Sequence, residues 1–184
     1  MKYFVDADVL ISLKESQLLI LLDIAFDSNW CVDEYIVDVE LRSNLPYQSS
    51  HEKEIRKELK NHLQSKGKVY HSGNHSDLIF LRDDIFGQYF IYDESDKGEF
   101  TLLADAIYEK GTVVSNNHND IKAPCMEKNI PYMDIWDILI ICYKRSYWKN
   151  DLDAELSYKK LKSGFNGVPG HHNSIQELIT QKVI

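Results

Sequence analysis

Short apolar segments alternate with longer amphipathic segments along this chain, and this alternation constrains the fold more than any other feature of the sequence. Residues 3–5, 30–32 and 112–114 are short apolar runs, and each is followed by polar residues and then by a segment with helical period. Two further short strands are expected at 68–70 and 130–133. Strands joined by helices run parallel and are covered on both faces. We therefore expect an α/β fold of three layers, with a central, mainly parallel sheet and helices on both faces.

The spacing of apolar residues in the rest of the chain predicts the helices. They are expected at about 9–26, 33–41, 51–66, 95–111, 121–126 and 136–147, followed by a short helix near the C-terminus. Residues 51–66 are strongly charged and carry a single apolar stripe, and Gly67 is expected to end this helix. The aromatic side chains between residues 80 and 92 are expected to lie in the core.

The length of 184 residues fits one domain with an additional tail. The charged Lys2 and Asp6 interrupt the apolar run at the N-terminus, and no apolar stretch approaches the length of a membrane span. These features predict a cytoplasmic protein without a membrane partner. The cysteines Cys31, Cys125 and Cys142 are far apart and odd in number, which argues against a disulfide framework or a thiolate zinc site.

Charge is unevenly distributed along the chain, although the net charge of -8 is at first sight unfavourable for a nucleic-acid partner. Residues 1–48 have 3 basic and 9 acidic side chains, and residues 76–109 have 2 and 9. Residues 49–75 and 138–184 each have more basic than acidic side chains. Such a chain could build an acidic, cation-binding centre surrounded by basic surface. The alternative is an ordinary solvated acidic surface, which charge alone favours.

Polar side chains gather where the strands are expected to end or where the following helices begin. The candidate site residues are Asp6, Asp8, Glu40, Asp96, Glu99, Ser115, Asn117 and Asp120. In a parallel sheet the carboxyl ends of the strands meet at one edge. Several carboxylates there would repel one another unless a divalent cation neutralised them, and oxygen ligands favour Mg²⁺ or Mn²⁺. Asp6 is the strongest candidate, because it directly follows an apolar strand and a buried carboxylate without a role is costly.

Four segments of the sequence together resemble the PIN domain, a family of metal-dependent ribonucleases that includes many toxins of toxin–antitoxin pairs. They are Phe-Val-Asp-Ala-Asp-Val-Leu-Ile at 4–11, Val-Asp-Val-Glu-Leu at 37–41, the Asp-Lys-Gly-Glu helix start at 96–99, and Val-Val-Ser-Asn-Asn at 113–117. The segments occur in the family's order. The resemblance covers about residues 1–147, with a longer and more divergent segment at about 48–92. Residues 148–184 are then a basic, helical C-terminal extension.

The resemblance implies roles for the individual acids. Asp6, Glu40 and Glu99 correspond to the first three catalytic, metal-binding carboxylates of the family, and Asp96 is an accessory ligand. The fourth acid of the family should stand at Asn117, where this chain has an amide. An amide oxygen can ligate Mg²⁺ but neutralises no charge, so either Asp120 substitutes for the missing acid or Asn117 completes the metal shell with weaker affinity for the metal.

Two further residues support this arrangement. Asp8 stands where the family often has a small polar residue and could restore the lost carboxylate, and Ser115 could hydrogen-bond Asp6. The implied reaction is hydrolysis of phosphodiester bonds in single-stranded RNA with Mg²⁺ or Mn²⁺, leaving a 5′-phosphate and a 3′-hydroxyl. An antitoxin protein and a second copy of the chain, forming a homodimer, are the protein partners that the resemblance adds.

Basic residues gather at 52–68 and 144–162, and the aromatic residues Tyr143, Tyr147, Trp148 and Tyr158 lie in or beside the second segment. Such segments can follow a single strand by charge and by stacking on its bases. Lys144, Arg145 and Lys149 are therefore the candidate RNA contacts. The alternative is that these helices are basic only for solubility.

Two other functions fit part of the pattern. Asp6-Ala7-Asp8 after a strand also resembles the nucleophile motif of haloacid-dehalogenase-like phosphatases, in which Asp6 would be the nucleophile. That family also needs a lysine and a later acidic pair, for which Asp134 and Asp137 come too soon after Ser115, and it gives no role to Glu40 or Glu99. The second alternative is a catalytically impaired PIN-like binding protein, because of the amide at Asn117.

Overall fold

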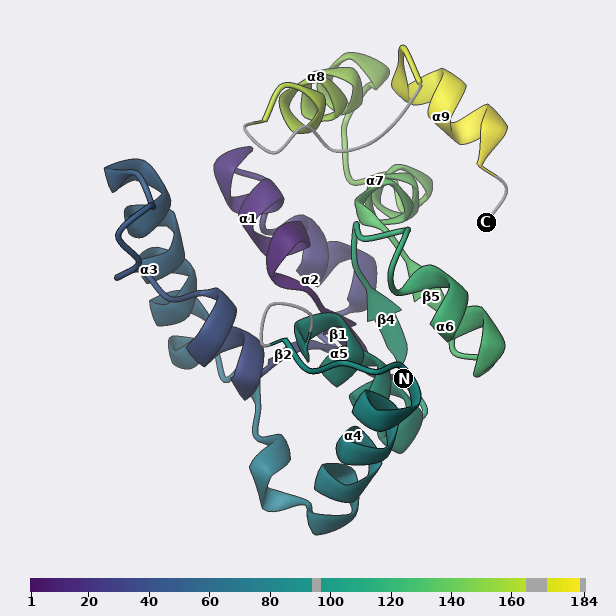
Figure 1. Ribbon diagram of the computed structural model, residues 1–184. Helices are drawn as coiled ribbons and strands as arrows, with labels where there is room; N and C mark the ends of the chain where they lie inside the picture. Colours follow the sequence, from purple (N-terminus) through teal and green to yellow (C-terminus); the bar gives the residue numbers. More distant parts are fainter. Residues whose placement is uncertain (94–96, 165–171, 183–184) are drawn as a thin grey trace.

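A five-stranded, all-parallel sheet forms the centre of the protein, with the strand order β3-β2-β1-β4-β5 (Figure 1). The computed structural model describes residues 1–93, 97–164 and 172–182. The strands are β1 (Tyr3–Val5), β2 (Trp30–Asp33), β3 (Val69–Tyr70), β4 (Thr112–Val114) and β5 (Tyr132–Met133). Phe4 pairs with Cys31 on one side and with Val113 on the other. The predicted α/β fold with a parallel sheet is confirmed.

Helices surround this sheet. They are α1 (Ala7–Glu15), α2 (Leu21–Phe26), the π-helix η1 (Ile36–Glu40), α3 (Ser50–Ser65), the 3-10 turn η2 (Ser72–Asn74), α4 (Ser76–Gln88), α5 (Lys97–Glu109), α6 (Lys122–Glu127), α7 (Ile135–Lys144), α8 (Asp151–Lys162) and α9 (Ile175–Gln181). Of the helices in the described part of the chain, none combines the length and apolarity that crossing a bilayer requires.

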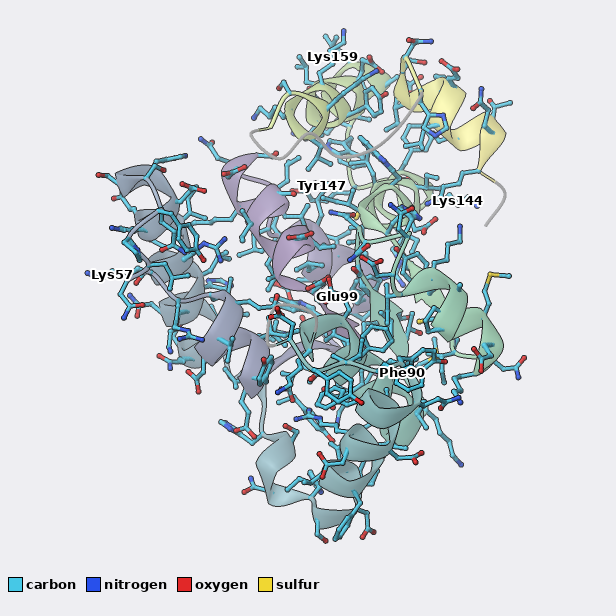
Figure 2. All side chains as sticks on the ribbon, viewed as in Figure 1. Lys57, Phe90, Glu99, Lys144, Tyr147 and Lys159 are labelled. Carbon is cyan, nitrogen blue, oxygen red and sulfur yellow. The ribbon has the colours of Figure 1, made fainter. Side chains whose placement is uncertain are left out.

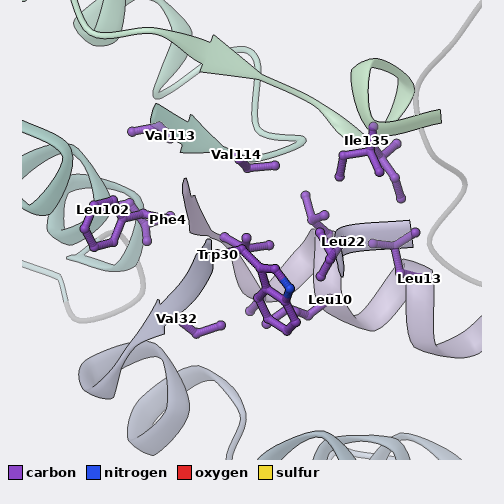
Figure 3. Close-up of a cluster of buried hydrophobic side chains, with 14 of the residues drawn as sticks. Phe4, Leu10, Leu13, Leu22, Trp30, Val32, Leu102, Val113, Val114 and Ile135 are labelled. Carbon is purple, nitrogen blue, oxygen red and sulfur yellow. The ribbon is translucent and has the colours of Figure 1, made fainter. Parts of the chain in front are cut away.

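The core lies on both faces of the sheet (Figure 3). On one face, α5 packs against β1 and β4, with α4 packed on α5. Leu102 of α5 lies beside Phe4 there. On the other face, Leu10 and Leu22 from α1 and α2 gather with Ile135 of α7. All of these side chains are fully buried, so the short strands are held by apolar contacts on both faces, which is typical of a parallel sheet.

The helix expected at 9–26 is in fact two helices. Gln17, with φ at 59°, adopts the left-handed conformation after α1. The N–H of Leu18 then donates to the carbonyl of Leu13 at 2.7 Å, which closes the end of α1. Both helices place leucines in the core. The helical spacing of apolar residues therefore continues through the break, and the sequence gives no sign of it.

The expectation that the aromatic residues between 80 and 92 lie in the core is wrong for three of them. Phe80, Phe90 and Tyr92 are 73%, 75% and 80% exposed. Helix α4 buries Leu78 and Ile85, which are two turns apart and form one narrow stripe. A helix with one stripe leaves its remaining side chains in water.

A buried ion network joins α4 and α5 to the end of β2. The Nη2 atom of Arg82 lies 2.6 Å from a carboxylate oxygen of Asp33 and 2.6 Å from one of Asp105. Both carboxylate side chains are fully buried. Burial, with Asp33 adding to it, raises the pKa of Asp105 well above its usual value despite the opposing charge of Arg82. One guanidinium therefore holds two buried acids.

The described part of residues 148–182 packs on α7. Tyr158 of α8 lies with its ring centroid 5.3 Å from that of Trp136, and both residues are buried. The Nζ atom of Lys182, after α9, lies 2.5 Å from Asp134 and 2.8 Å from Asp137 at the start of α7. The C-terminal helices are thus attached to the domain by apolar contacts and by ion pairs.

Candidate functional site

Asp6 lies at the carboxyl edge of the sheet, between β1 and α1. Its backbone N–H donates to the carbonyl of Val114 at 2.9 Å, which continues the pairing of β1 with β4. Its carboxylate caps α1 by accepting from the N–H of Ala7 at 2.7 Å, and it accepts from Ser115 Oγ at 2.6 Å. The hydrogen bond between Ser115 and Asp6 was expected from the sequence and is confirmed. Asp6 is only 3% exposed, so β1 and the cap hold a buried carboxylate in place.

Glu40 reaches the same edge from the end of η1, the irregular helix after β2. Its Oε1 atom lies against Gly98, where a Cβ atom would come within 1.5 Å of it. The same oxygen is buried and accepts no hydrogen bond from the described residues. Arg56 donates to the backbone carbonyl of Glu40. Gly98 therefore makes room for a carboxylate that is left with an unused oxygen.

Glu99 stands in the first turn of α5, which runs back toward the start of β4 and so begins at the carboxyl edge. Its Oε1 atom accepts from Asn117 Nδ2 at 2.9 Å. The same amide nitrogen donates to Asp120 at 2.8 Å, and the backbone N–H of Asp120 donates to the amide oxygen at 3.3 Å. Asn117 thus joins two acids by hydrogen bonds, with its nitrogen, not its oxygen, directed at their carboxylates.

The electrostatics of these acids reflect burial and mutual repulsion. Burial, followed by the charges of Asp8 and Glu99, raises the pKa of Asp6 to about 8, against the hydrogen bonds from Ser115 and Ala7. Burial, followed by the charges of Asp6, Glu99 and Asp8, raises the pKa of Glu40 to about 9, although Arg56 opposes this. Burial also raises the pKa of Glu99. Four acids are thus close enough to affect one another's protonation.

The remaining candidate acids that the structure describes are both exposed. Asp8, on the first turn of α1, is exposed and lines a hollow beside Glu40 and Glu99. Asp120 is also exposed and lines a second hollow on the other side of Glu99, with a volume of about 330 Å³. Asp96 lies outside the described residues.

The donor set suits a hard divalent cation, because it consists of carboxylate oxygens. In the described parts of the chain, no three His, Cys, Asp or Glu side chains are already arranged as a metal site. The orphaned Oε1 of Glu40 nevertheless fits a cation, since a buried acceptor without a partner is costly. Asp6, Glu40 and Glu99 could therefore hold a metal ion after small side-chain movements.

Arg145 and Lys144, two of the basic residues suggested as RNA contacts, do not lie beside these acids. Arg145 bonds to Asp27 at 2.5 Å and to the carbonyl of Ile24 at 2.8 Å. Both partners lie at the end of α2, just before β2 begins, which is the amino edge of the sheet. Lys144, beside Arg145 at the end of α7 (Figure 2), and Lys149 are exposed. Whether they contact RNA stays a prediction.

The structure adds neighbours of the acids that the sequence analysis did not single out. The hollow beside Asp8, Glu40 and Glu99 is also lined by Arg42, Tyr47, Gln48 and Arg56. A signal was present in the sequence, since Arg42 follows Glu40 by two residues. The segment after Arg42 is long and irregular, so the sequence does not indicate that Tyr47, Gln48 and Arg56 lie near the site.

No family model, curated protein or solved structure matches this chain. The function is therefore inferred from the residues of the site and from their geometry.

Proposed function

We propose that the protein is a ribonuclease of PIN type that uses Mg²⁺ or Mn²⁺ to hydrolyse phosphodiester bonds of single-stranded RNA. The observation that carries the proposal is the buried Oε1 atom of Glu40, which has no hydrogen-bond partner among the described residues and lies in a group of acids at the carboxyl edge of a parallel sheet. This edge is where ligands bind in such sheets. The order of Asp6, Glu40 and Glu99 in the chain, with its resemblance to the PIN family, supports the reaction type.

The chain's own residues have distinct roles in this proposal. Asp6, Glu40 and Glu99 hold the cation, and Asp120 adds negative charge from the next hollow. Ser115 orients Asp6 through its hydrogen bond, and Asn117 holds Glu99 and Asp120 together. A divalent ion held there would lower the pKa of a bound water and stabilise the charge that develops on phosphate oxygens.

The proposal is tested by incubating the purified protein with a mixed pool of single-stranded RNA and Mn²⁺, beside a sample with EDTA. The expected result is cleavage that depends on Mn²⁺ and leaves 5′-phosphate ends, together with a higher melting temperature in Mn²⁺. Absence of both effects would favour the PIN-like binding protein. Hydrolysis of p-nitrophenyl phosphate without RNA cleavage would favour the phosphatase. An antitoxin, a homodimer and a cytoplasmic location stay predictions.

Without metal, the protein should lose stability as the pH rises. Asp6 and Glu40 have pKa values of about 8 and about 9 in the folded protein, against about 4 in an unfolded chain. The folded state therefore binds more protons between about pH 4 and pH 9, and the free energy of unfolding falls across this window. Urea unfolding in EDTA at pH 5, 7 and 9 measures this fall, which saturating Mn²⁺ should reduce. A rise in stability over the same range would contradict the assigned burial of these acids.

Asn117→Asp should strengthen metal binding and weaken the metal-free protein. The change replaces an amide that donates to Glu99 and Asp120 with a further carboxylate. We expect Mn²⁺ to bind about tenfold more tightly, because a further carboxylate faces the ion. The metal-free melting temperature should fall, because hydrogen bonds from the amide no longer relieve the repulsion between the carboxylates. Calorimetric titration with Mn²⁺ and thermal melting in EDTA measure the two effects. Asn29→Asp, at an exposed position just before β2 and so at the opposite edge of the sheet, is the matched control.

A further inference from the structure

The hollow beside the acids has two chemically different sides. Its volume is about 440 Å³, within the range of about 300–1,000 Å³ that is typical of small-molecule sites. Asp8, Glu40 and Glu99 lie on the acidic side. The other side comes from the connection between η1 and α3 and from α3 itself, and it is formed by Arg42, Tyr47, Gln48 and Arg56. The hollow thus extends from the proposed cation site to a basic and aromatic surface.

Backbone contacts hold the two guanidinium groups in place. Arg42 donates from Nε to the carbonyl of Val39 at 3.1 Å, and Arg56 donates to the carbonyl of Glu40. A guanidinium has five N–H donors, so most donors of each group stay available. Within residues 1–93, 97–164 and 172–182, neither arginine forms a salt bridge of 4.0 Å or less. Both groups are therefore suited to bind a phosphate.

Gln48 has an acceptor without a partner in the wall of this hollow. The residue is 7% exposed, and its Nε2 atom donates to the carbonyl of Arg42 at 2.8 Å. Exchanging the two amide atoms would put two oxygens together, so this hydrogen bond fixes the orientation of the amide. The Oε1 atom is buried and has no hydrogen-bond partner in the described structure. Because this oxygen is buried, the Gln48 side chain has to turn toward the hollow before a ligand with an N–H or O–H donor can relieve the cost of the orphaned acceptor.

Tyr47 provides a flat apolar surface at the rim of the hollow. It is 80% exposed, although a large aromatic side chain loses free energy by remaining in water. Stacking of a nucleic-acid base on an exposed aromatic ring contributes about 1–3 kcal/mol in single-strand binding. The ring, the two arginines and the amide thus match the base, the phosphate and a polar donor of one nucleotide.

We propose that this hollow is a subsite for the nucleotide next to the scissile phosphate. Arg42 and Arg56 bind a phosphate of that nucleotide, Tyr47 stacks on its base, and Gln48 accepts a hydrogen bond from one of its N–H or O–H groups. The proposal rests on the proposed ribonuclease function and deepens it, because it assigns the residues that position the RNA strand beside Glu40 and Glu99.

The test measures binding, so that it does not depend on cleavage. A fluorescein-labelled single-stranded RNA octamer is titrated with the Asp6→Asn protein in Mg²⁺, and its anisotropy is followed. In this background we expect Arg42→Gln and Tyr47→Leu each to weaken binding about tenfold, while Tyr47→Phe keeps most of it. Arg42→Gln should also lower the slope of log Kd against log salt concentration by about 0.7, and Tyr47→Leu should leave the slope unchanged.

Two controls match these changes. Lys110→Gln removes an exposed charge just before β4, at the opposite edge of the sheet, and Phe80→Leu removes an exposed aromatic ring from α4. The subsite is overturned if Arg42→Gln and Tyr47→Leu bind the RNA as tightly as these controls do. It is also overturned if the Asp6→Asn parent does not bind the RNA. If the expected losses occur but the wild type does not cleave RNA, the hollow binds RNA but is not a nuclease subsite, and the ribonuclease proposal fails. If the wild type cleaves RNA and the variants bind normally, only the subsite is wrong.

Discussion

Replacing Asp6 with Asn should reduce Mn²⁺-dependent cleavage of RNA by at least about three orders of magnitude, through loss of a carboxylate that holds the cation. The substitution keeps the shape of a side chain that is 3% exposed and can keep hydrogen bonds to Ser115 and to the N–H of Ala7. It also removes a charge that raises the pKa of Glu40. The metal-free protein should therefore melt at the same temperature or higher. Single-turnover cleavage and thermal melting in EDTA measure the two quantities.

Glu40→Gln separates the ribonuclease from the phosphatase, because both reactions need Asp6 and only the ribonuclease needs Glu40. We expect this variant also to lose RNA cleavage. Asp23→Asn is the matched control, since Asp23 accepts a hydrogen bond from Trp30 at 2.8 Å on α2 and lies outside the group of acids. Wild-type cleavage by either Asp6→Asn or Glu40→Gln would contradict the assignment. A loss of RNA cleavage that is accompanied by a lower melting temperature would also count against the assignment, because loss of folded protein would explain it.

Replacing Arg82 with Met should lower the free energy of unfolding by about 3–5 kcal/mol, because two buried carboxylates then lose their common partner. Asp33 and Asp105 have fully buried side chains, and Arg82 is 13% exposed. The two acids would have to take up protons or admit water. The loss should therefore be smaller at pH 5 than at pH 8. Urea unfolding followed by circular dichroism measures it.

The control for Arg82 is the exposed ion pair between Arg145 and Asp27. Arg145→Met removes a guanidinium from a pair in water, and we expect a much smaller change in stability. A second control is Arg82→Met combined with Asp33→Asn and Asp105→Asn, which removes the charges together and should recover part of the loss. Equal losses in the free energy of unfolding for Arg82→Met and Arg145→Met would show that burial of the ion network does not determine its contribution to stability.

Local sequence patterns were sufficient to predict most of the individual elements. The strand ending at Val5 and the one ending at Val114 are apolar runs too short for a helix, and both were predicted within one residue. Helix α3 shows why this succeeds, because Ile55, Leu59 and Leu63 repeat at helical spacing, are buried, and are followed by Gly67 at φ 62°. Propensity and periodicity act over a few residues, so they can be read from the sequence.

The break between α1 and α2 and the exposure of Phe80 and Phe90 could not be predicted in the same way. An apolar side chain does not by itself determine which surface is available to cover it. The position of α4 on α5 decides that Leu78 and Ile85 are covered and that Phe80 is not, whereas Phe90 follows the end of α4 with φ at 56°. Burial is a property of the packed helices, not of the residue.

For the site, the sequence by itself determined that Asp6 and Ser115 each directly follow a short apolar strand, and in a parallel sheet the carboxyl ends of the strands lie at one edge. The pairing of β1 with β4, which brings Ser115 to Asp6, was decided only by the tertiary structure. Only the tertiary structure decided that Glu40 lies against Gly98 with an unused oxygen, and that Asn117 directs its nitrogen at the acids. It also decided that Arg42 and Gln48 line the hollow beside them, and that Arg145 lies at the other edge of the sheet. The physical reason is range: the positions of strands and the period of helices depend on residues close together in the sequence, whereas strand order and contacts between distant segments depend on how the elements pack.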